Sequence, residues 1–256
     1  MSWMSTKKTK LRKLMQLTNV DKSMAEKLLR MHSGNVNAAT DYFYTHQNKF
    51  ASSVPKVGDV NKLKAIFKKY ADDDNPKIMQ EKYGDFLAAI GVSEEGLGSF
   101  AIPYKLNAKN MGTIEEKEFV ESLSKFGVDT TSKIKQWAEG LLKEVGNEEG
   151  FKEFYKWMFG YLKEDSKRKT IDLDMATAVW EEILKGRFAY LTEWLEFLEQ
   201  ESKPKINRDV WNQLVEFAFF IKRDFKNWDP NGAWPVLIDT FAEWMQKKTG
   251  TTKKST

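Results

Sequence analysis

The sequence predicts an all-α protein that consists of a small N-terminal three-helix bundle and a larger helical domain. Apolar residues recur at spacings of three and four along most of the chain, and no stretch alternates convincingly between apolar and polar residues. The apolar content of 41% is sufficient for a packed core. A segment with Ser, Pro and Gly separates the two helical parts. We therefore divide the chain into a bundle at 8–47, a linker at 48–59, a domain at 60–247 and a basic tail at 248–256.

Three short helices account for the N-terminal part. Asp21 is placed to cap the second helix, and Ser33-Gly34-Asn35 connects the second helix to the third. The residues at helical spacing are Leu11, Leu14, Met15 and Leu17, then Met24, Ala25, Leu28 and Leu29, then Ala38, Ala39, Tyr42 and Phe43.

The larger domain is predicted to be helical almost throughout. Pro235 suits the first turn of its last helix, because the N–H that proline lacks would have no partner there. The segments with helical periodicity are 60–71, 83–90, 115–126, 132–145, 151–163, 173–185, 187–200, 207–223 and 235–247.

Three connections in the larger domain resemble calcium-binding loops between two helices. Residues 107–118 have Gly112 at position 6, an isoleucine at position 8 and Glu118 at position 12, but Lys and Met stand where oxygen ligands are needed. Residues 72–83 keep acids at positions 1 and 3 but lack the glycine and the last acid, and residues 164–175 lack the ligands. The sequence therefore predicts degenerate EF-hand-like helix pairs without a metal site.

Composition excludes most catalytic classes. The chain has no cysteine and only two histidines, so a thioester-forming thiol, a disulfide, a zinc site or a histidine-based triad lacks its residues. It has neither a glycine-rich phosphate loop with its Lys-Ser/Thr sequel nor a carboxylate pair in an apolar setting. No apolar run approaches the roughly 18 residues of a membrane span, and the start lacks a signal peptide's apolar core. We expect a soluble intracellular protein with no catalytic residue, no cofactor and no membrane partner.

The net charge of +4 is unevenly distributed. Residues 1–46 carry a net charge of +5, and residues 245–256 contain four lysines and no acid, so the middle of the chain is acidic. Two alternative functions remain open on these features. One is a basic nucleic-acid-binding adaptor, whose binding would weaken steeply with salt. The other is an EF-hand-like calcium sensor, which calorimetry with calcium would test.

Two regions resemble known domains. Residues 11–47, with Ala25, Leu28-Leu29, Asn35, Ala39 and Tyr42-Phe43, resemble a ubiquitin-associated domain. Residues 60–246 resemble the potentiating-neddylation domain of the defective-in-cullin-neddylation proteins, and the order of the two domains also agrees. The landmarks are Ile102-Pro-Tyr-Lys105, Phe151-Lys-Glu-Phe-Tyr155, Ile171-Asp-Leu-Asp-Met-Ala176, Trp180, Gly186-Arg-Phe188, Arg208-Asp-Val-Trp211 and Gly232-Ala-Trp-Pro-Val-Leu-Ile-Asp239.

The resemblance implies a monomeric, non-catalytic scaffold found in the cytoplasm and the nucleus. Its implied partners are the C-terminal winged-helix region of a cullin and a conjugating enzyme charged with the ubiquitin-like modifier. The conjugating enzyme would supply the thioester, which agrees with the absence of cysteine here. Holding both partners together supplies proximity and orientation, which are worth up to roughly 7–11 kcal/mol in ideal cases. No nucleic acid is implied.

The resemblance also assigns site residues. The cullin-binding patch of the family falls on Asp209, Ala233 and Asp239, where two acids can pair basic side chains and a small residue permits close approach. A second site of the family accepts the acetylated N-terminal methionine of the conjugating enzyme. It falls on Tyr83, Ile102, Pro103, Leu106, Ile114, Tyr161, Met175 and Val179. Ser99 and Glu182 stand where the family has apolar residues.

Weak ubiquitin binding by the N-terminal bundle is a further expectation. Ubiquitin-binding bundles of this class usually carry a Met-Gly-Phe/Tyr loop after the first helix. Here the corresponding residues are Thr18, Asn19 and Val20, with Tyr42 and Phe43 on the last helix. A structural or autoregulatory role for the bundle is the alternative.

Overall fold

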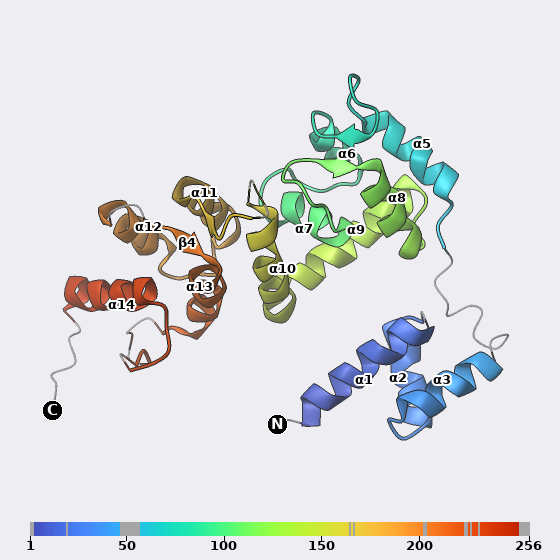
Figure 1. Ribbon diagram of the computed structural model, residues 1–256, viewed down its shortest axis with the longest axis horizontal. Helices are drawn as coiled ribbons and strands as arrows, with labels where there is room; N and C mark the ends of the chain where they lie inside the picture. The colour runs from blue at the N-terminus through green and yellow to red at the C-terminus, as the bar shows by residue number, and fades with distance from the viewer. Residues whose placement is uncertain are drawn as a thin grey trace. The chain divides into compact units, whose positions relative to one another are not determined.

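The computed structural model describes residues 3–18, 20–46, 57–163, 165, 167–201, 204–222, 225, 227–229 and 231–250, with side chains from residue 7 onward. The chain forms two compact units, residues 1–63 with 123–129 and residues 64–122 with 130–256. Nearly all regular structure in the described ranges is helical (Figure 1). The predicted all-α class is therefore confirmed.

The N-terminal part of the first unit is a three-helix bundle (blue in Figure 1), as predicted. Asp21 Oδ1 accepts the N–H of Met24 at 2.8 Å, and Asn35 Oδ1 accepts the N–H of Ala38 at 3.2 Å, which caps the second and third helices. The helices are α1 Trp3–Thr18, α2 Lys22–Met31 and α3 Val36–Thr45. The core that they share consists of Leu14, Val20, Ala25, Leu28, Leu29, Ala39 and Phe43.

The C-terminal end of the predicted linker is held in place by hydrogen bonds. Gly58 N–H donates to the carbonyl of Ser124 at 2.9 Å, and the Ser124 hydroxyl donates to the carbonyl of Gly58 at 3.0 Å. A Cβ atom at position 58 would lie 3.3 Å from Ser124 Cα, so glycine permits this close approach. The rest of the predicted linker, apart from 57–59, lies outside the described residues.

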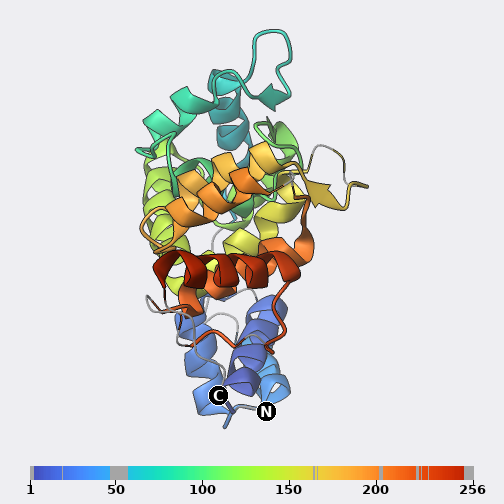
Figure 2. The same ribbon diagram turned by 90° about the vertical axis from the view of Figure 1, so that its left-hand side faces the viewer.

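The remaining helices form two successive helix–loop–helix pairs and a last helix. The first pair comprises α5 Val60–Tyr70, β1 Ile78–Met79, α6 Tyr83–Ala89, α7 Leu97–Leu106, β2 Ile114–Glu115 and α8 Glu116–Lys125. Helix α9 Thr131–Gly146 connects the two pairs. The second pair comprises α10 Glu148–Tyr161, β3 Thr170–Ile171, α11 Leu173–Ile183, α12 Leu191–Gln200, β4 Ile206–Asn207 and α13 Arg208–Phe220. The last helix is α14 Val236–Thr249. Figure 2 shows α14 (red) crossing in front of the orange helices, and it packs on α12 and α13.

The paired strands give the helix pairs an EF-hand-like construction. Met79 pairs with Ile114 and Ile171 pairs with Ile206, both antiparallel. Each of these four residues stands at position 8 of its loop, and each is at most 2% exposed. The three predicted degenerate loops are therefore joined by a fourth, at 199–210. Sequence analysis missed this loop because it lacks the glycine at position 6 and the acid at position 12.

Helix α7 is a second feature that sequence periodicity missed. The predicted helical segments leave out residues 91–114, where the glycines at 91, 96 and 98 indicate a loop, but the structure has a helix there with Pro103 in its interior. Pro103 cannot donate a hydrogen bond to the carbonyl of Ser99, four residues earlier. The hydroxyl of Tyr83 donates to that carbonyl instead, at 2.9 Å. A side chain from α6 thus satisfies the carbonyl that Pro103 leaves without its usual donor in α7.

An aromatic stack forms the centre of the second pair. Tyr155, Trp180 and Trp211, from α10, α11 and α13, are each fully buried. The ring of Trp211 stacks on Tyr155 with centroids 4.6 Å apart and on Trp180 at 5.5 Å. Trp180 Nε1–H donates to Tyr155 Oη at 2.7 Å, and Trp211 Nε1–H donates to the Tyr155 carbonyl at 2.8 Å. The polar atoms of the stack are thereby satisfied inside the core.

Candidate functional site

The first candidate surface lies at the start of α14, where Asp239 occupies the first turn. The Nε1–H of buried Trp228 donates to Asp239 Oδ1 at 3.1 Å. Among the described residues, Asp239 Oδ2 receives no hydrogen bond. The helix dipole also favours an acid in a first turn. Asp239 is thus a half-buried carboxylate with one oxygen fixed and the other available to a cation.

The loop before α14 presents Ala233 to solvent. Asp229 organises this loop, because its Oδ1 accepts the N–H of Asn231 at 3.0 Å and its carbonyl accepts the N–H of Gly232 at 2.9 Å. Asp229 is therefore engaged in the turn. The small side chain of Ala233 leaves the loop open to a close approach.

An exposed apolar surface adjoins these residues, and sequence reasoning missed it. Val236 is 82% exposed and Phe220 is 49% exposed. The ring of Trp234 lies between them in the chain and packs on Phe220 with centroids 5.8 Å apart. Helical periodicity could have predicted the exposure of Val236. The buried stripe of α14 consists of Ile238, Phe241, Ala242 and Met245, and position 236 lies outside this stripe.

Asp209 is the third predicted cullin-binding residue, and it is exposed in the first turn of α13. The side chain of Asn207 caps this helix by accepting the N–H of Val210 at 2.9 Å. Asp209 lies about 12 Å along α13 from Phe217, given a rise of about 1.5 Å per residue, and the ring of Phe217 contacts Trp234 at 5.4 Å. The contact between Phe217 and Trp234 thus connects the helix that carries Asp209 to the loop that carries Ala233.

The second predicted site is largely part of the core. Tyr83 and Met175 are half-buried, whereas the other six residues are buried. The exposed fractions are 0% for Ile102, 1% for Leu106 and Ile114, 5% for Tyr161 and 3% for Val179, and Pro103 is also buried. In the structure as described, an incoming side chain can therefore reach Tyr83 and Met175 before the others.

Tyr83 and Tyr161 are the polar members of this second site. Tyr161 Oη accepts the N–H of Gly112 at 3.1 Å. Burial raises the pKa of Tyr83 well above its ordinary value, and Tyr161 nearby raises it further. Burial likewise raises the pKa of Tyr161, although the bond from Gly112 opposes this. Both phenols stay neutral at physiological pH, so the site has hydroxyl groups but no charge from these residues.

The two positions that depart from the family pattern join one hydrogen-bonded cluster. The Ser99 hydroxyl donates to the carbonyl of Gly96 at 3.0 Å, and the N–H of Gly96 donates to Glu182 Oε1. Ser99 also supplies the carbonyl that Tyr83 contacts. These polar residues connect the start of α7 to α11 beside the predicted site.

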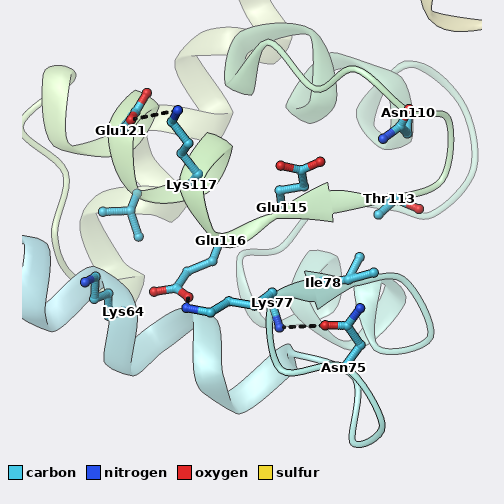
Figure 3. Close-up of a pocket in the computed structure, with 11 residues that line it drawn as sticks. Lys64, Asn75, Lys77, Ile78, Asn110, Thr113, Glu115, Glu116, Lys117 and Glu121 are labelled. Atoms are coloured by element: carbon cyan, nitrogen blue, oxygen red, sulfur yellow. Dashed lines mark hydrogen bonds and ion pairs between the residues drawn. The ribbon is translucent and has the colours of Figure 1, made fainter.

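A hollow of about 570 Å³ adjoins the first strand pair, and Figure 3 shows its lining. Charged groups of both signs surround it, and Lys77 Nζ is 2.6 Å from Glu116 Oε2. Lys117 Nζ lies 4.0 Å from Glu121 Oε1 in the same helix. None of the eight residues of the second predicted site lines this hollow. Its charges pair largely with one another.

The acids of the first two degenerate loops bind backbone donors. Asp72 Oδ1 accepts the N–H groups of Gln80 and Glu81, each at 3.0 Å. Glu118 accepts the N–H of Lys109 through Oε1 and of Glu115 through Oε2, each at 3.1 Å. In the described ranges, no group of three or more metal-ligating side chains gathers. No described helix is long and apolar enough to cross a membrane.

The N-terminal bundle buries most of the residues predicted to bind ubiquitin. Thr18, Val20 and Phe43 are 4%, 3% and 3% exposed, and Asn19 lies outside the described residues. Tyr42 is half-buried, and its ring stacks on His46 with centroids 4.3 Å apart. These side chains mainly build the bundle.

Two apolar residues near the Thr18–Val20 segment are exposed, and the sequence analysis did not predict their exposure. Leu17 is 43% exposed and Tyr44 is 51% exposed. The Tyr44 hydroxyl donates to the Leu17 carbonyl at 2.5 Å, which places the two residues side by side. Periodicity did not indicate the exposure of Leu17, because Leu17 shares the helical spacing of the buried residues of α1.

Comparisons with known proteins identify both parts of the chain. A family described as cullin binding matches residues 132–244, and one described as a UBA-like domain matches residues 8–49. The chain is 26% identical over 240 residues to defective in cullin neddylation protein 1 of Yarrowia lipolytica, covering 93% of this chain and 96% of that protein. It is 31% identical over 182 residues to DCN1-like protein 4 of Homo sapiens, covering 71% of this chain and 62% of that protein. It is 25% identical to defective in cullin neddylation protein 1 of Caenorhabditis elegans, with 95% of this chain and 91% of that protein covered.

Proposed function

The chain belongs to the defective-in-cullin-neddylation family, and on this premise we propose that it is a non-catalytic scaffold that binds a cullin and a charged conjugating enzyme together. The modifier would pass from the thiol of the conjugating enzyme to a cullin lysine. A chain without cysteine cannot carry the modifier as a thioester. Its contribution is the reduced entropy cost of bringing the two partners into a reactive arrangement.

The surface at the start of α14 carries the cullin-binding part of this proposal. Asp239 is oriented by Trp228, and Ala233 and Val236 offer a small and an apolar contact close to it in the chain. Asp209 supplies a second carboxylate farther along α13. A basic, partly apolar cullin surface complements this arrangement. A protein partner typically covers about 800 Å², which is enough to contact residues from both helices.

The test is a binding titration with a cullin C-terminal fragment, followed by a reconstituted neddylation assay at limiting conjugating enzyme. Asp239→Lys should weaken cullin binding by about thirtyfold or more, because reversal places a cation where the partner's cation docks. The stimulation of neddylation should fall with it. Glu139→Lys is the matched control, because Glu139 is an exposed acid on α9. Equal affinity of wild type and Asp239→Lys would contradict the assignment.

Capture of the conjugating enzyme's N-terminal methionine between α6, α7 and α11 is the second part of the proposal. The half-buried side chains of Tyr83 and Met175 support it, because they offer an apolar entrance above the buried residues. A labelled peptide with the N-terminal sequence of the conjugating enzyme should bind the full chain, and replacing its first methionine with aspartate should abolish binding. Val60→Ala is a control at an exposed apolar site elsewhere, and Met175→Ala should weaken binding. Identical affinity of both peptides would exclude this site.

Weak ubiquitin binding by the bundle is the third part. The exposed pair Leu17 and Tyr44 supports it, since the predicted Val20 and Phe43 are core residues. Leu17→Asp should remove the chemical-shift changes that ubiquitin causes in an NMR titration. Met31→Ala, at a residue 52% exposed on α2, serves as the control. Unchanged shifts in Leu17→Asp would exclude this surface.

A further inference from the structure

A groove of about 530 Å³ lies on the N-terminal bundle, at a different place from Leu17 and Tyr44. It runs between α1 and α2 and is lined by Lys7, Lys10, Leu11, Glu26, Leu29, Arg30, Ser33 and Gly34. The α1 residues follow helical spacing, and so do the α2 residues, so each helix contributes one stripe. Lys10 and Leu17 are about 10 Å apart along α1 at about 1.5 Å per residue. The groove is therefore separate from the surface that we assign to ubiquitin.

The groove combines a cationic rim with an apolar floor. Lys7, Lys10 and Arg30 are exposed, whereas Leu29 is 8% exposed and Leu11 packs against the bundle core. A Cβ atom at Gly34 would lie 3.7 Å from Lys10 Nζ. The ammonium group of Lys10 therefore reaches from α1 to the connection between α2 and α3.

The three cationic side chains of the rim have no acidic partner among the described residues. In the part of the chain that the structure describes, Lys7, Lys10 and Arg30 form no ion pair. Glu26 is the single acid among the described residues of the lining. Like charges around one groove repel each other, and an anionic ligand relieves that repulsion. Arg30 also lies in the last turn of α2, where a cation suits the helix dipole, but that role does not extend to Lys7 or Lys10.

We propose that this groove binds a short acidic peptide segment of a partner protein, with one aliphatic side chain of the peptide on Leu11 and Leu29. Carboxylates on either side of that anchor would pair with Lys10 and Arg30. A free phosphate would leave the leucine floor uncovered. Single-stranded nucleic acid binds by stacking bases on aromatic side chains, and the described residues of the lining include none. The cationic rim and the leucine floor of the groove together favour an acidic peptide with one aliphatic side chain.

The probe is a fluorescent peptide in which aspartate and glutamate flank one leucine, titrated into the full chain at low salt. We expect saturable binding that weakens steeply as salt is added. Lys10→Glu and Arg30→Glu should each lower the affinity at least about tenfold. Lys27→Glu is the matched control, because Lys27 is exposed on α2 but does not line the groove. A peptide with serine in place of leucine should bind more weakly.

A second variant tests the groove without removing a cation. Ser33 has φ 53°, a left-handed conformation that aspartate tolerates, so Ser33→Asp adds a carboxylate at the groove with little strain. This variant should also weaken binding of the acidic peptide. Its melting temperature, measured by circular dichroism, and its cullin binding should stay unchanged. The proposal fails if no saturable binding occurs, if Lys27→Glu has the same effect as Lys10→Glu, or if an oligothymidine competes as well as the unlabelled peptide.

Discussion

The two helix–loop–helix pairs of the larger unit share one strand-pairing scheme but stabilise their loops differently. In the first pair, the carboxylates of Asp72 and Glu118 accept backbone N–H groups where a calcium-binding loop would use such oxygens for the ion. In the second pair, an aromatic stack around Trp211 joins the helices. The first pair thus uses acids internally. The second pair and α14, which packs on it, leave Asp209 and Asp239 available at the surface, on helices that an apolar core holds in place.

The largest effect is expected for Trp211→Ala in the aromatic stack. It removes a fully buried indole together with its bond to the Tyr155 carbonyl, and should lower the free energy of unfolding by about 3–5 kcal/mol. Urea denaturation followed by circular dichroism measures this. Trp244→Ala is the control, because Trp244 is only half-buried. A loss below that of the control would show that the stack does not organise the second pair.

The first pair should respond most to a change at Glu118. Glu118→Gln preserves the shape but replaces one accepting oxygen with a donor, so a backbone N–H loses its partner. We expect a loss of about 2 kcal/mol in the free energy of unfolding. Glu115→Gln is the control, because the Glu115 carboxylate accepts no hydrogen bond within the described ranges. Hydrogen exchange should show the loop at 107–118 opening first. Uniform exchange across both pairs would mean that the acid does not act locally.

Sequence reasoning succeeded where the structure depends on neighbours in the chain. The cap at Asp21 and the position-8 residues Ile114 and Ile171 follow from local patterns. Helix α7 could not be predicted in this way, because the donor that satisfies the carbonyl freed by Pro103 belongs to Tyr83, twenty residues earlier. Tertiary contacts of this kind leave no periodic signal.

The candidate sites show the same limit. The turn at Asp229 and the exposure of Ala233 agree with local chemistry. Val236 and Leu17 were missed because an apolar residue in a helix is ordinarily assigned to the core. The resemblance assigns Val20 to a ubiquitin-binding loop, and only the structure shows that its side chain is buried.

Tyr83→Phe tests the proline helix of the first pair directly. It removes only the hydroxyl that donates to the Ser99 carbonyl, and should lower the free energy of unfolding by about 1 kcal/mol. Tyr70→Phe is the control, because no hydrogen bond of its hydroxyl occurs among the described residues. Equal melting temperatures of the two variants would show that the carbonyl finds water or another donor instead.

The smallest effect is expected at the ion pairs between α10 and α13 of the second pair. Lys156 Nζ lies 2.6 Å from Glu216 Oε1, and Lys152 Nζ lies 3.0 Å from Oε2. Burial alone would raise the pKa of Glu216, but the hydrogen bonds from the two lysines outweigh it and hold the pKa below its ordinary value near 4.5. Because the side chain is 35% exposed, solvent screening keeps the contribution below about 1 kcal/mol.

A folded-state pKa below the unfolded value stabilises the fold above the unfolded pKa, and this stabilisation disappears as the pH falls through the folded-state pKa. The difference in stability between wild type and Glu216→Gln should therefore be constant at neutral pH, begin to shrink near pH 4.5 and vanish as the pH falls through the lower folded-state pKa. Urea denaturation across this pH range measures the difference. Glu121→Gln is the first-pair control, since Glu121 has one lysine 4.0 Å away in its own helix. If both variants lose the same small amount at every pH, the contact between α10 and α13 depends on the aromatic stack and its apolar surroundings, and the charges contribute only to the surface.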